Sequence, residues 1–218
     1  MILLLGSERA ALPDVPVPAP CRRLLLPRRR EAAEARLRAE LARGDAHLLI
    51  SVGFAAAADQ RLGVADLLQA TRLFGGADVY LDLPALQAPG AIRGSLCSLD
   101  LEAAPEPTRP SLTPAARQRR LPPVYAFDDS AFWVARLAQA ANLPCLVLRA
   151  VLLPSMDAQP DPVLQSISRF TLFALARRRG VRELRGLARD AGQCRRQLAA
   201  TLSILLVLHG QAVPALPG

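Results

Sequence analysis

The sequence predicts an α/β fold in which helices pack against a mixed central sheet. Short apolar runs, typical of buried strands, alternate with longer segments whose apolar residues recur at helical spacing. The expected order is strand, strand, helix, several strands, helix, strand and two helices, which is typical of an α/β sandwich. With 218 residues, of which 51% are hydrophobic, the chain suits a single domain, residues 1–218, with a sizeable core.

The first half of the chain is expected to contain one helix among several strands. The helix covers about 31–43, where apolar and charged residues mix, and Gly44 provides its stop. The stretch "HLLISVG" is a continuous apolar run, which is the pattern of a strand buried on both faces. The strands of this half are expected at 2–6, 22–27, 47–53, 66–74 and 77–83.

The second half begins with a loop and then returns to strands and helices. Residues 84–123 are predicted to be loop-rich, because six prolines lie between Pro105 and Pro123. Further along, Asp161 followed by Pro162 indicates the start of a helix that runs to about 179. The other elements are expected at 124–127 and 145–153 for strands, and at about 131–141 and 182–208 for helices.

Charge and aromatic content argue against a nucleic acid as the partner. The formal net charge is +8, and every basic residue is an arginine. These arginines are scattered over the polar faces of the predicted helices rather than gathered in one tail. Aromatic residues make up only 4% of the chain, which leaves little material for stacking bases. The alternative is a basic face that makes a peripheral contact with acidic lipid headgroups.

Cysteine spacing and the apolar runs predict a cytoplasmic protein without a metal centre. The four cysteines, at positions 21, 97, 145 and 194, form no CxxC pair, so neither a zinc site nor a disulfide framework is indicated. The opening apolar run is too short for a signal peptide and predicts a strand instead. The run at 198–208 falls well short of the roughly 20 residues that a membrane-spanning helix needs. Reduced thiols in the cytoplasm are therefore expected.

Two segments carry a resemblance to a known superfamily. The stretch "LLISVGFAAAADQRLGVADLLQATRL" (48–73) resembles S-x-G-x-A-G-G-L-D-P-x-L-x-x-G-D-L-V of the nucleoside phosphorylases and nucleosidases. The stretch "YAFDDSAFWVARLAQAANLPCLVLRAV" (125–151) is similar to their V-D-M-E-S-A-x-x-A followed by x-x-G-(L/V)-P-x-x-x-(L/I)-R-x-(I/V)-S-D. The strand that ends at Gly6 fits their first strand, so the resemblance spans nearly the whole chain. Matching positions in the first segment are Ser51, Gly53, Ala55, Asp59, Leu62, Asp66 and Leu67.

Within this superfamily the chain looks most like the hopanoid-associated phosphorylases. The resemblance implies a three-layer α/β/α sandwich with a mixed central sheet, assembled as a homo-oligomer. It also implies cleavage of the N-glycosidic bond of a purine nucleoside, with phosphate as co-substrate and no other cofactor. The expected substrate is a small-molecule or lipid nucleoside, such as adenosylhopane.

The resemblance also implies roles for individual residues. Asp129 stands in the place of a glutamate that binds ribose hydroxyls, and Asp128 stands in the place of the methionine before it, so both are candidate ribose ligands. Gly6 and Gly53 are expected to border the phosphate, and Arg9 is a candidate phosphate ligand by its position after the first strand. The expected pocket residues are Phe54, Ala55, Phe127 and Leu153.

The chain departs from the superfamily pattern where the chemistry needs an acid and two glycines. Leu152 and Leu153 replace the S-D whose aspartate supplies the acid near purine N7, and a leucine cannot donate a proton. Asp157 could substitute only if its loop turns back. Ala56 and Ala57 replace the glycines, and their methyl groups narrow the backbone approach that a ligand needs. The alternative function is therefore that of a catalytically impaired member that binds a ligand or an assembly partner.

The acidic pair also has a purely structural interpretation. An aspartate before "SAFWVARL" accepts hydrogen bonds from the free N–H groups of a helix start and interacts favourably with the helix dipole. Capping is the favoured interpretation, and both hold together if Asp128 caps the helix while Asp129 faces a cleft. The adjacent Phe132 and Trp133 are expected in the core rather than in a base or lipid pocket.

Overall fold

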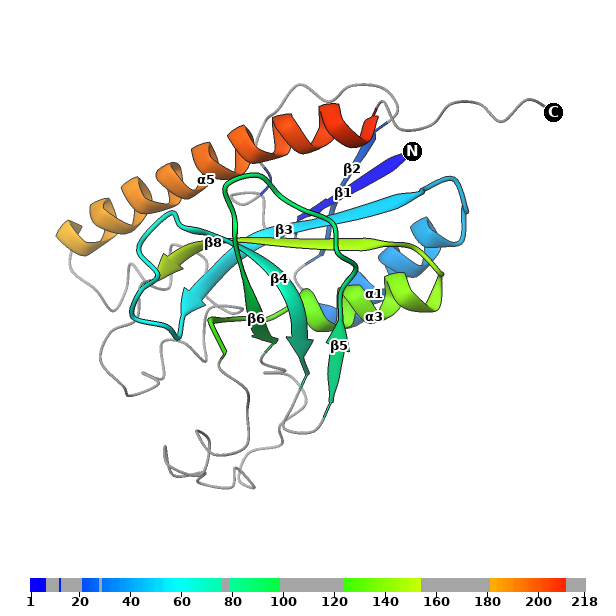
Figure 1. Ribbon diagram of the computed structural model, residues 1–218, viewed down its shortest axis with the longest axis horizontal. Coiled ribbons are helices and arrows are strands. Elements are labelled where there is room, and N and C mark those ends of the chain that lie inside the picture. Colours follow the sequence, from blue (N-terminus) through cyan, green and yellow to red (C-terminus); the bar gives the residue numbers. More distant parts are fainter. Residues whose placement is uncertain are drawn as a thin grey trace.

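The computed structural model describes residues 1–6, 12, 21–27, 29–75, 79–98, 124–153 and 181–210. These residues form one eight-stranded sheet and three helices (Figure 1). The strands are β1 (Ile2–Gly6), β2 (Cys21–Leu25), β3 (Leu48–Ala57), β4 (Leu67–Phe74), β5 (Tyr80–Asp82), β6 (Ile92–Ser98), β7 (Ala126–Asp128) and β8 (Cys145–Leu153). The helices are α1 (Arg30–Leu41), α3 (Ala131–Ala140) and α5 (Val181–Gly210).

The central sheet is mixed, as the sequence predicts, and part of it closes into a ring. Strands β2, β1, β3 and β8 are parallel neighbours, whereas β8 pairs with β4 in antiparallel fashion. From β4 the ladder continues through parallel β6 and β7, and β7 returns to β3 as an antiparallel partner. The ring closes because β3 extends past the end of β1, which leaves Ala56 and Ala57 free to pair with β7. The ends of β3, β7 and β8 therefore meet in one place.

Helices cover both faces of β1 and β3. Leu3 and Leu5 of β1 belong to a buried cluster with α1 and α3, whereas Ile2 and Leu4 belong to a second cluster with α5. This division follows from the pleat, which points successive side chains to opposite faces. It also explains why residues 48–53 are buried without interruption, which confirms the predicted strand buried on both faces. His47, just before the strand, and Phe54, within it, are half-buried.

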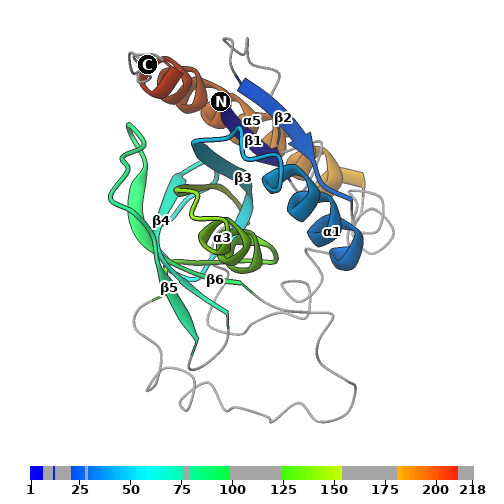
Figure 2. The same ribbon diagram turned by 90° about the vertical axis from the view of Figure 1, so that its right-hand side faces the viewer.

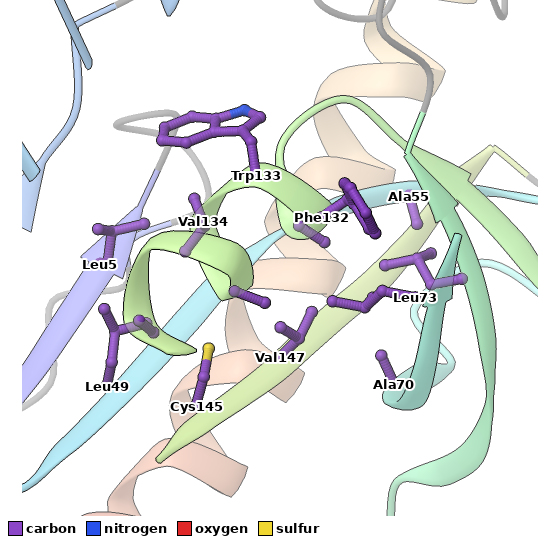
Figure 3. Packing of buried hydrophobic residues seen from close by; sticks show 14 of the residues in the cluster. Leu5, Leu49, Ala55, Ala70, Leu73, Phe132, Trp133, Val134, Cys145 and Val147 are labelled. Atoms are coloured by element: carbon purple, nitrogen blue, oxygen red, sulfur yellow. The ribbon is translucent and has the colours of Figure 1, made fainter. Parts of the chain in front are cut away.

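Helix α3 lies in the concave side of the curved sheet (Figure 2). Seven of its ten residues are buried. Phe132 and Val134 pack among side chains from β3, β4 and β8 (Figure 3). The expectation that Phe132 and Trp133 are core residues is confirmed. The start of α3 is consequently held in a fixed position beside the strand ends.

The structure corrects the predicted elements in two places. The segment 84–123, expected to be loop-rich, contains β6, whose sequence "IRGSLCS" has weak strand propensity and becomes a strand by pairing with β4 and β7. Strand β3 continues to Ala57, beyond the predicted end at 53, because its last residues pair with β7 and β8. Strand β8 has the predicted bounds, and α5 covers the predicted 182–208. The helix expected at 162–179 and the rest of the proline-rich segment, 99–123, lie outside the described residues.

Gly94 in β6 gives a test of how tightly the ring is packed. A Cβ added at this position would lie 2.6 Å from Cγ of Tyr125, so the ring of Tyr125 or the strand would have to shift. We expect Gly94→Ala to lower the free energy of unfolding by about 1–3 kcal/mol. The control is Gly186→Ala in α5, where an added Cβ meets nothing within 4 Å. Because alanine favours a helix, this control should stabilise the fold by about 0.5–1 kcal/mol. Urea unfolding of both variants measures the difference, and equal effects would contradict the packing.

Candidate active site

Arg149 of β8 is a buried arginine that lies where β3, β7 and β8 come together. Its Nε donates a hydrogen bond to Oδ2 of Asp128 at 2.8 Å. Its Nη1 donates to the carbonyl oxygens of Ser51 and Leu148 at 3.0 and 3.1 Å, and both Nη atoms lie 3.3 Å from Oγ of Ser51. Nη2 also contacts Oγ of Ser130 at 3.4 Å. All three guanidinium nitrogens therefore have acceptors.

The pair formed by Arg149 and Asp128 is fully enclosed by protein. The two side chains are 1% and 0% exposed. Removing both charges from water costs several kcal/mol per ion, and only good geometry with further hydrogen bonds offsets this cost. The hydrogen-bond acceptors around Arg149 offset this cost for the arginine. For the carboxylate, Asp128 accepts hydrogen bonds from Oγ of Ser98 at 2.5 Å and from the backbone N–H of Ala131 at 2.9 Å.

Asp128 accepts a hydrogen bond from a free N–H at the start of α3, although Ser130 is the N-cap residue and makes no side-chain cap hydrogen bond. Oδ2 of Asp128 receives the N–H of Ala131, the first residue of α3. The next N–H of the helix, that of Phe132, donates to Oγ of Ser98 at 2.8 Å. Two of the free donors at the start of α3 are thus satisfied by side chains that precede the helix or come from β6. Both carboxylate oxygens of Asp128 are engaged within the protein, in agreement with the capping interpretation for this member of the pair.

Asp129 has a different environment from its neighbour. Its side chain is half-buried, and the structure gives it no ion pair within the described residues. Burial raises the pKa of Asp129 above its ordinary value, and the negative charge of Asp128 raises it further. The positive charge of Arg149 and a hydrogen bond from Ser130 lower the pKa in part. A half-buried acid whose pKa is raised by burial is a common feature of functional sites.

Strand register brings most of the expected site residues to the same place. Ala56 of β3 pairs with Phe127 on one side and with Leu153 on the other. Gly53 pairs with Arg149, and Gly6 at the end of β1 pairs with the residue before Gly53. The expected residues Phe54 and Ala55 fill the interval between these pairs, Phe54 half-buried and Ala55 buried.

Gly53 has a packing reason for lacking a side chain. A Cβ there would lie 3.1 Å from Nε of Arg149, closer than most real contacts. The glycine therefore makes room for the guanidinium group. Ala56 and Ala57, in the place of two glycines, are buried strand residues rather than parts of a loop. Arg9 and Asp157 lie outside the described residues.

Arg149 is the central residue that the sequence analysis did not assign to the site. Its signal is present in the sequence, because one arginine interrupts the otherwise apolar strand "CLVLRAVLL". A charged residue in a fully buried strand requires a charged partner. The partner, Asp128, could not be named from spacing alone, because β7 and β8 are brought together only through β3.

The described residues offer neither a metal site nor a reactive thiol. Among them, no three His, Cys, Asp or Glu side chains gather closely enough to hold a metal ion. Burial raises the pKa of Cys97 to about 11 and that of Cys145 to about 12. Burial likewise raises the pKa of Cys194 to about 11. These thiols are protonated at neutral pH and are poor nucleophiles.

Comparison with known proteins identifies the fold. No protein-family profile matches the sequence, and no curated protein matches it. Among solved structures, the putative 5′-methylthioadenosine/S-adenosylhomocysteine nucleosidase of Borrelia burgdorferi, bound to adenine, matches with a TM-score of 0.60. The identity is 10%, over 94% of this chain and 100% of that chain.

Two further structures give the same result. An MTAN of Chlamydia trachomatis bound to MTA matches with a TM-score of 0.59 and 13% identity, over 95% of this chain and 97% of that one. The nucleosidase of Neisseria meningitidis, in complex with methylthio-immucillin-A, matches with a TM-score of 0.56 and 14% identity, over 93% and 98%. This chain has the fold of these nucleosidases. Nucleosidases are among the proteins that the sequence resembles, so the resemblance holds at the level of the fold.

Removing the charge of Asp128 should destabilise the whole fold. Asp128→Asn leaves Arg149 buried without its counter-ion, and breaking a buried pair in this way costs about 3–5 kcal/mol. The matched control is Asp82→Asn, which breaks the exposed pair with Arg72 and should cost no more than about 1 kcal/mol. Chemical denaturation measures both free energies of unfolding. Equal losses would show that the buried pair is not a major contributor.

Removing the charge of Asp129 should instead stabilise the fold, by an amount that depends on pH. Because its pKa is raised in the folded state, the stability linked to this group is present below the ordinary aspartate pKa and is lost as pH rises through the raised value. Asp129→Asn should therefore raise Tm at neutral pH, and the gain should vanish below about pH 4. Thermal unfolding from acid to neutral pH measures this profile. A gain that is constant with pH, or a loss at neutral pH, would contradict the assignment.

Proposed function

We propose that this protein binds a purine nucleoside at the ends of β3, β7 and β8 and cleaves its N-glycosidic bond. The proposal is supported by the fold, which is shared with nucleosidases solved with adenine and with MTA. The single observation that carries it is the different state of the two adjacent acids. Asp128 forms a buried ion pair with Arg149, whereas Asp129 is a half-buried carboxylate with a raised pKa beside the same strand ends.

In this proposal Asp129 holds the sugar. Ribose hydroxyl groups donate hydrogen bonds to its carboxylate, and these bonds stabilise the charged form that burial disfavours. The bond to the base breaks through a transition state in which positive charge develops on the sugar. A carboxylate next to the sugar stabilises that positive charge. Gly6 and the backbone of Gly53 border the nucleophile, because Arg149 fills the space where a side chain of Gly53 would lie. The nucleophile is phosphate in a phosphorylase and water in a nucleosidase.

The interaction of Arg149 with Asp128 supports this role by positioning. It fixes the turn between β7 and α3, and Asp129 is part of that turn. A carboxylate held by a rigid turn loses little further freedom when it binds a ligand. Arg149 has its nitrogens occupied by protein acceptors, so it positions Asp129 and does not itself contact the nucleoside.

A second function, binding without cleavage, is favoured by one specific observation. Leu153 stands in the place of the acid that activates the leaving purine, and its register partner is the buried Ala56. Without a proton donor, departure of the base is slower because its developing negative charge is not neutralised. Under this second proposal the chain is a ligand-binding or assembly partner that keeps the fold.

The proposed substrate class is an adenine nucleoside. The sequence resemblance adds adenosylhopane, a lipid nucleoside, as the preferred member of that class. Phosphate is the proposed co-substrate, and a homo-oligomer is the proposed assembly; both stay predictions.

The test is release of free adenine from a set of nucleosides. Purified protein is incubated with adenosine, 5′-methylthioadenosine or adenosylhopane, each with and without phosphate, and free adenine is measured by chromatography. We expect release from at least one substrate and its loss in Asp129→Ala. The control Asp82→Asn, at an exposed site on β5, should keep full activity.

The two proposed functions give different results in a parallel thermal-shift titration. Stabilisation by a nucleoside without release of adenine supports binding without cleavage. Release of adenine that survives Asp129→Ala would overturn the assigned role of Asp129. Neither release nor stabilisation with any of the three nucleosides would overturn both cleavage and ligand binding.

A further inference from the structure

The outer face of α5 ends in a cluster of exposed apolar side chains. Ile204, Val207 and Leu208 are 47%, 54% and 56% exposed. They are neighbours on one side of the helix, because residues three and four positions apart share a face. The opposite side of the same two turns, which includes Leu205 and Leu206, is buried against the sheet. Single exposed apolar residues are ordinary, but three large ones together indicate a contact surface.

The same side of α5 carries exposed arginines further toward its start. Arg189 and Arg196 are exposed, and both fall on the line of the helix that passes through Val207, since their separations from it are close to whole numbers of turns. The outer face is therefore basic over its first part and apolar at its end. Cationic groups beside exposed apolar groups are typical of helices that lie in a membrane interface.

Charge and area favour a lipid surface over a second copy of the chain. The exposed Arg189 and Arg196 on this face favour an anionic surface, whereas a second copy would present the same arginines on its own α5; the homo-oligomer proposed above would form through another face. A stable protein interface buries about 800 Å² on each partner, which is more than three partly exposed side chains supply. No helix among the described residues is both long and apolar enough to cross a membrane.

We propose that the outer face of α5 docks the protein onto anionic lipid membranes. The apolar end, formed by Ile204, Val207 and Leu208, enters the boundary between headgroups and acyl chains. Arg189 and Arg196 contact the anionic headgroups, each adding electrostatic attraction that salt weakens. This inference is independent of the nucleoside site, because α5 packs on the opposite face of β1 and β3 from α3.

The test is co-sedimentation of the full chain with lipid vesicles. Vesicles of phosphatidylcholine alone are compared with an equal mixture of phosphatidylcholine and phosphatidylglycerol, at low and high salt. We expect binding to the mixture that falls as salt rises and weak binding to phosphatidylcholine. The variant Ile204→Gln/Val207→Gln/Leu208→Gln should weaken binding to the mixture by roughly tenfold or more, because its apolar anchor is lost.

Two further variants keep the result specific to this face. The control Val79→Gln/Ile92→Gln removes two exposed apolar side chains that lie outside α5, just before β5 and at the start of β6, and should bind as the unaltered protein does. The variant Arg189→Gln/Arg196→Gln should bind the mixture with a weaker dependence on salt. Tm values of all variants are compared first, since exposed positions tolerate glutamine without loss of folding.

Three outcomes would overturn the inference. They are no binding of the unaltered protein to the anionic vesicles at low salt, equal binding by the triple variant, and light scattering that shows a dimer which the triple variant converts to a monomer. The last result would assign the face to a second copy of the chain.

Discussion

The arrangement of the strand ends depends on one buried ion pair, that of Arg149 and Asp128. Two charges enclosed by protein are stable only if every remaining donor and acceptor is satisfied. Here the partners come from separate parts of the chain: Ser51 from β3, Ser98 from β6 and Ser130 from the turn before α3. These hydrogen bonds join strands that backbone pairing alone would leave free to shift relative to one another.

The pair also explains why two adjacent aspartates have different chemistry. Asp128 is neutralised by Arg149 and caps α3 through Ala131, so it is part of the framework. Burial and the negative charge of Asp128 both disfavour the charged form of Asp129. Arg149 and Ser130 offset this effect only in part. A group held in a state that costs stability is a common sign that the site serves a ligand rather than the fold.

Much of the fold follows from the sequence, because its elements are local patterns. Strand β8 is a nearly continuous apolar run and helix α5 has apolar residues at helical spacing, and these signals give their bounds closely. The mixed sheet follows from the order of all the predicted elements. Strand β6 was missed because Gly94 and its serines disfavour a strand, and only its neighbours on both sides stabilise it. Closure of the ring was equally beyond prediction, since it depends on β3 running four residues past Gly53 into pairings with β7 and β8.

The candidate site, like the fold, could be predicted from the sequence only in part. Asp129, Gly53, Phe127 and Leu153 could be selected because each lies in or beside one of the two stretches that resemble the superfamily motifs. Their mutual placement, and the partner of Arg149, could not, because both depend on contacts between segments far apart in the sequence. Arg149 shows the general lesson: an isolated charge in an apolar strand predicts a buried partner without saying where the partner lies.

Arg149 and Asp128 belong to the framework, and we infer that Asp129 faces the ligand. A crystal structure of the protein grown with adenosine tests it most directly. We expect ribose hydroxyls within hydrogen-bond distance of Asp129, with the bond from Nε of Arg149 to Asp128 unchanged. A sugar bound away from Asp129, or an Arg149 that leaves Asp128 to hold the nucleoside, would contradict it.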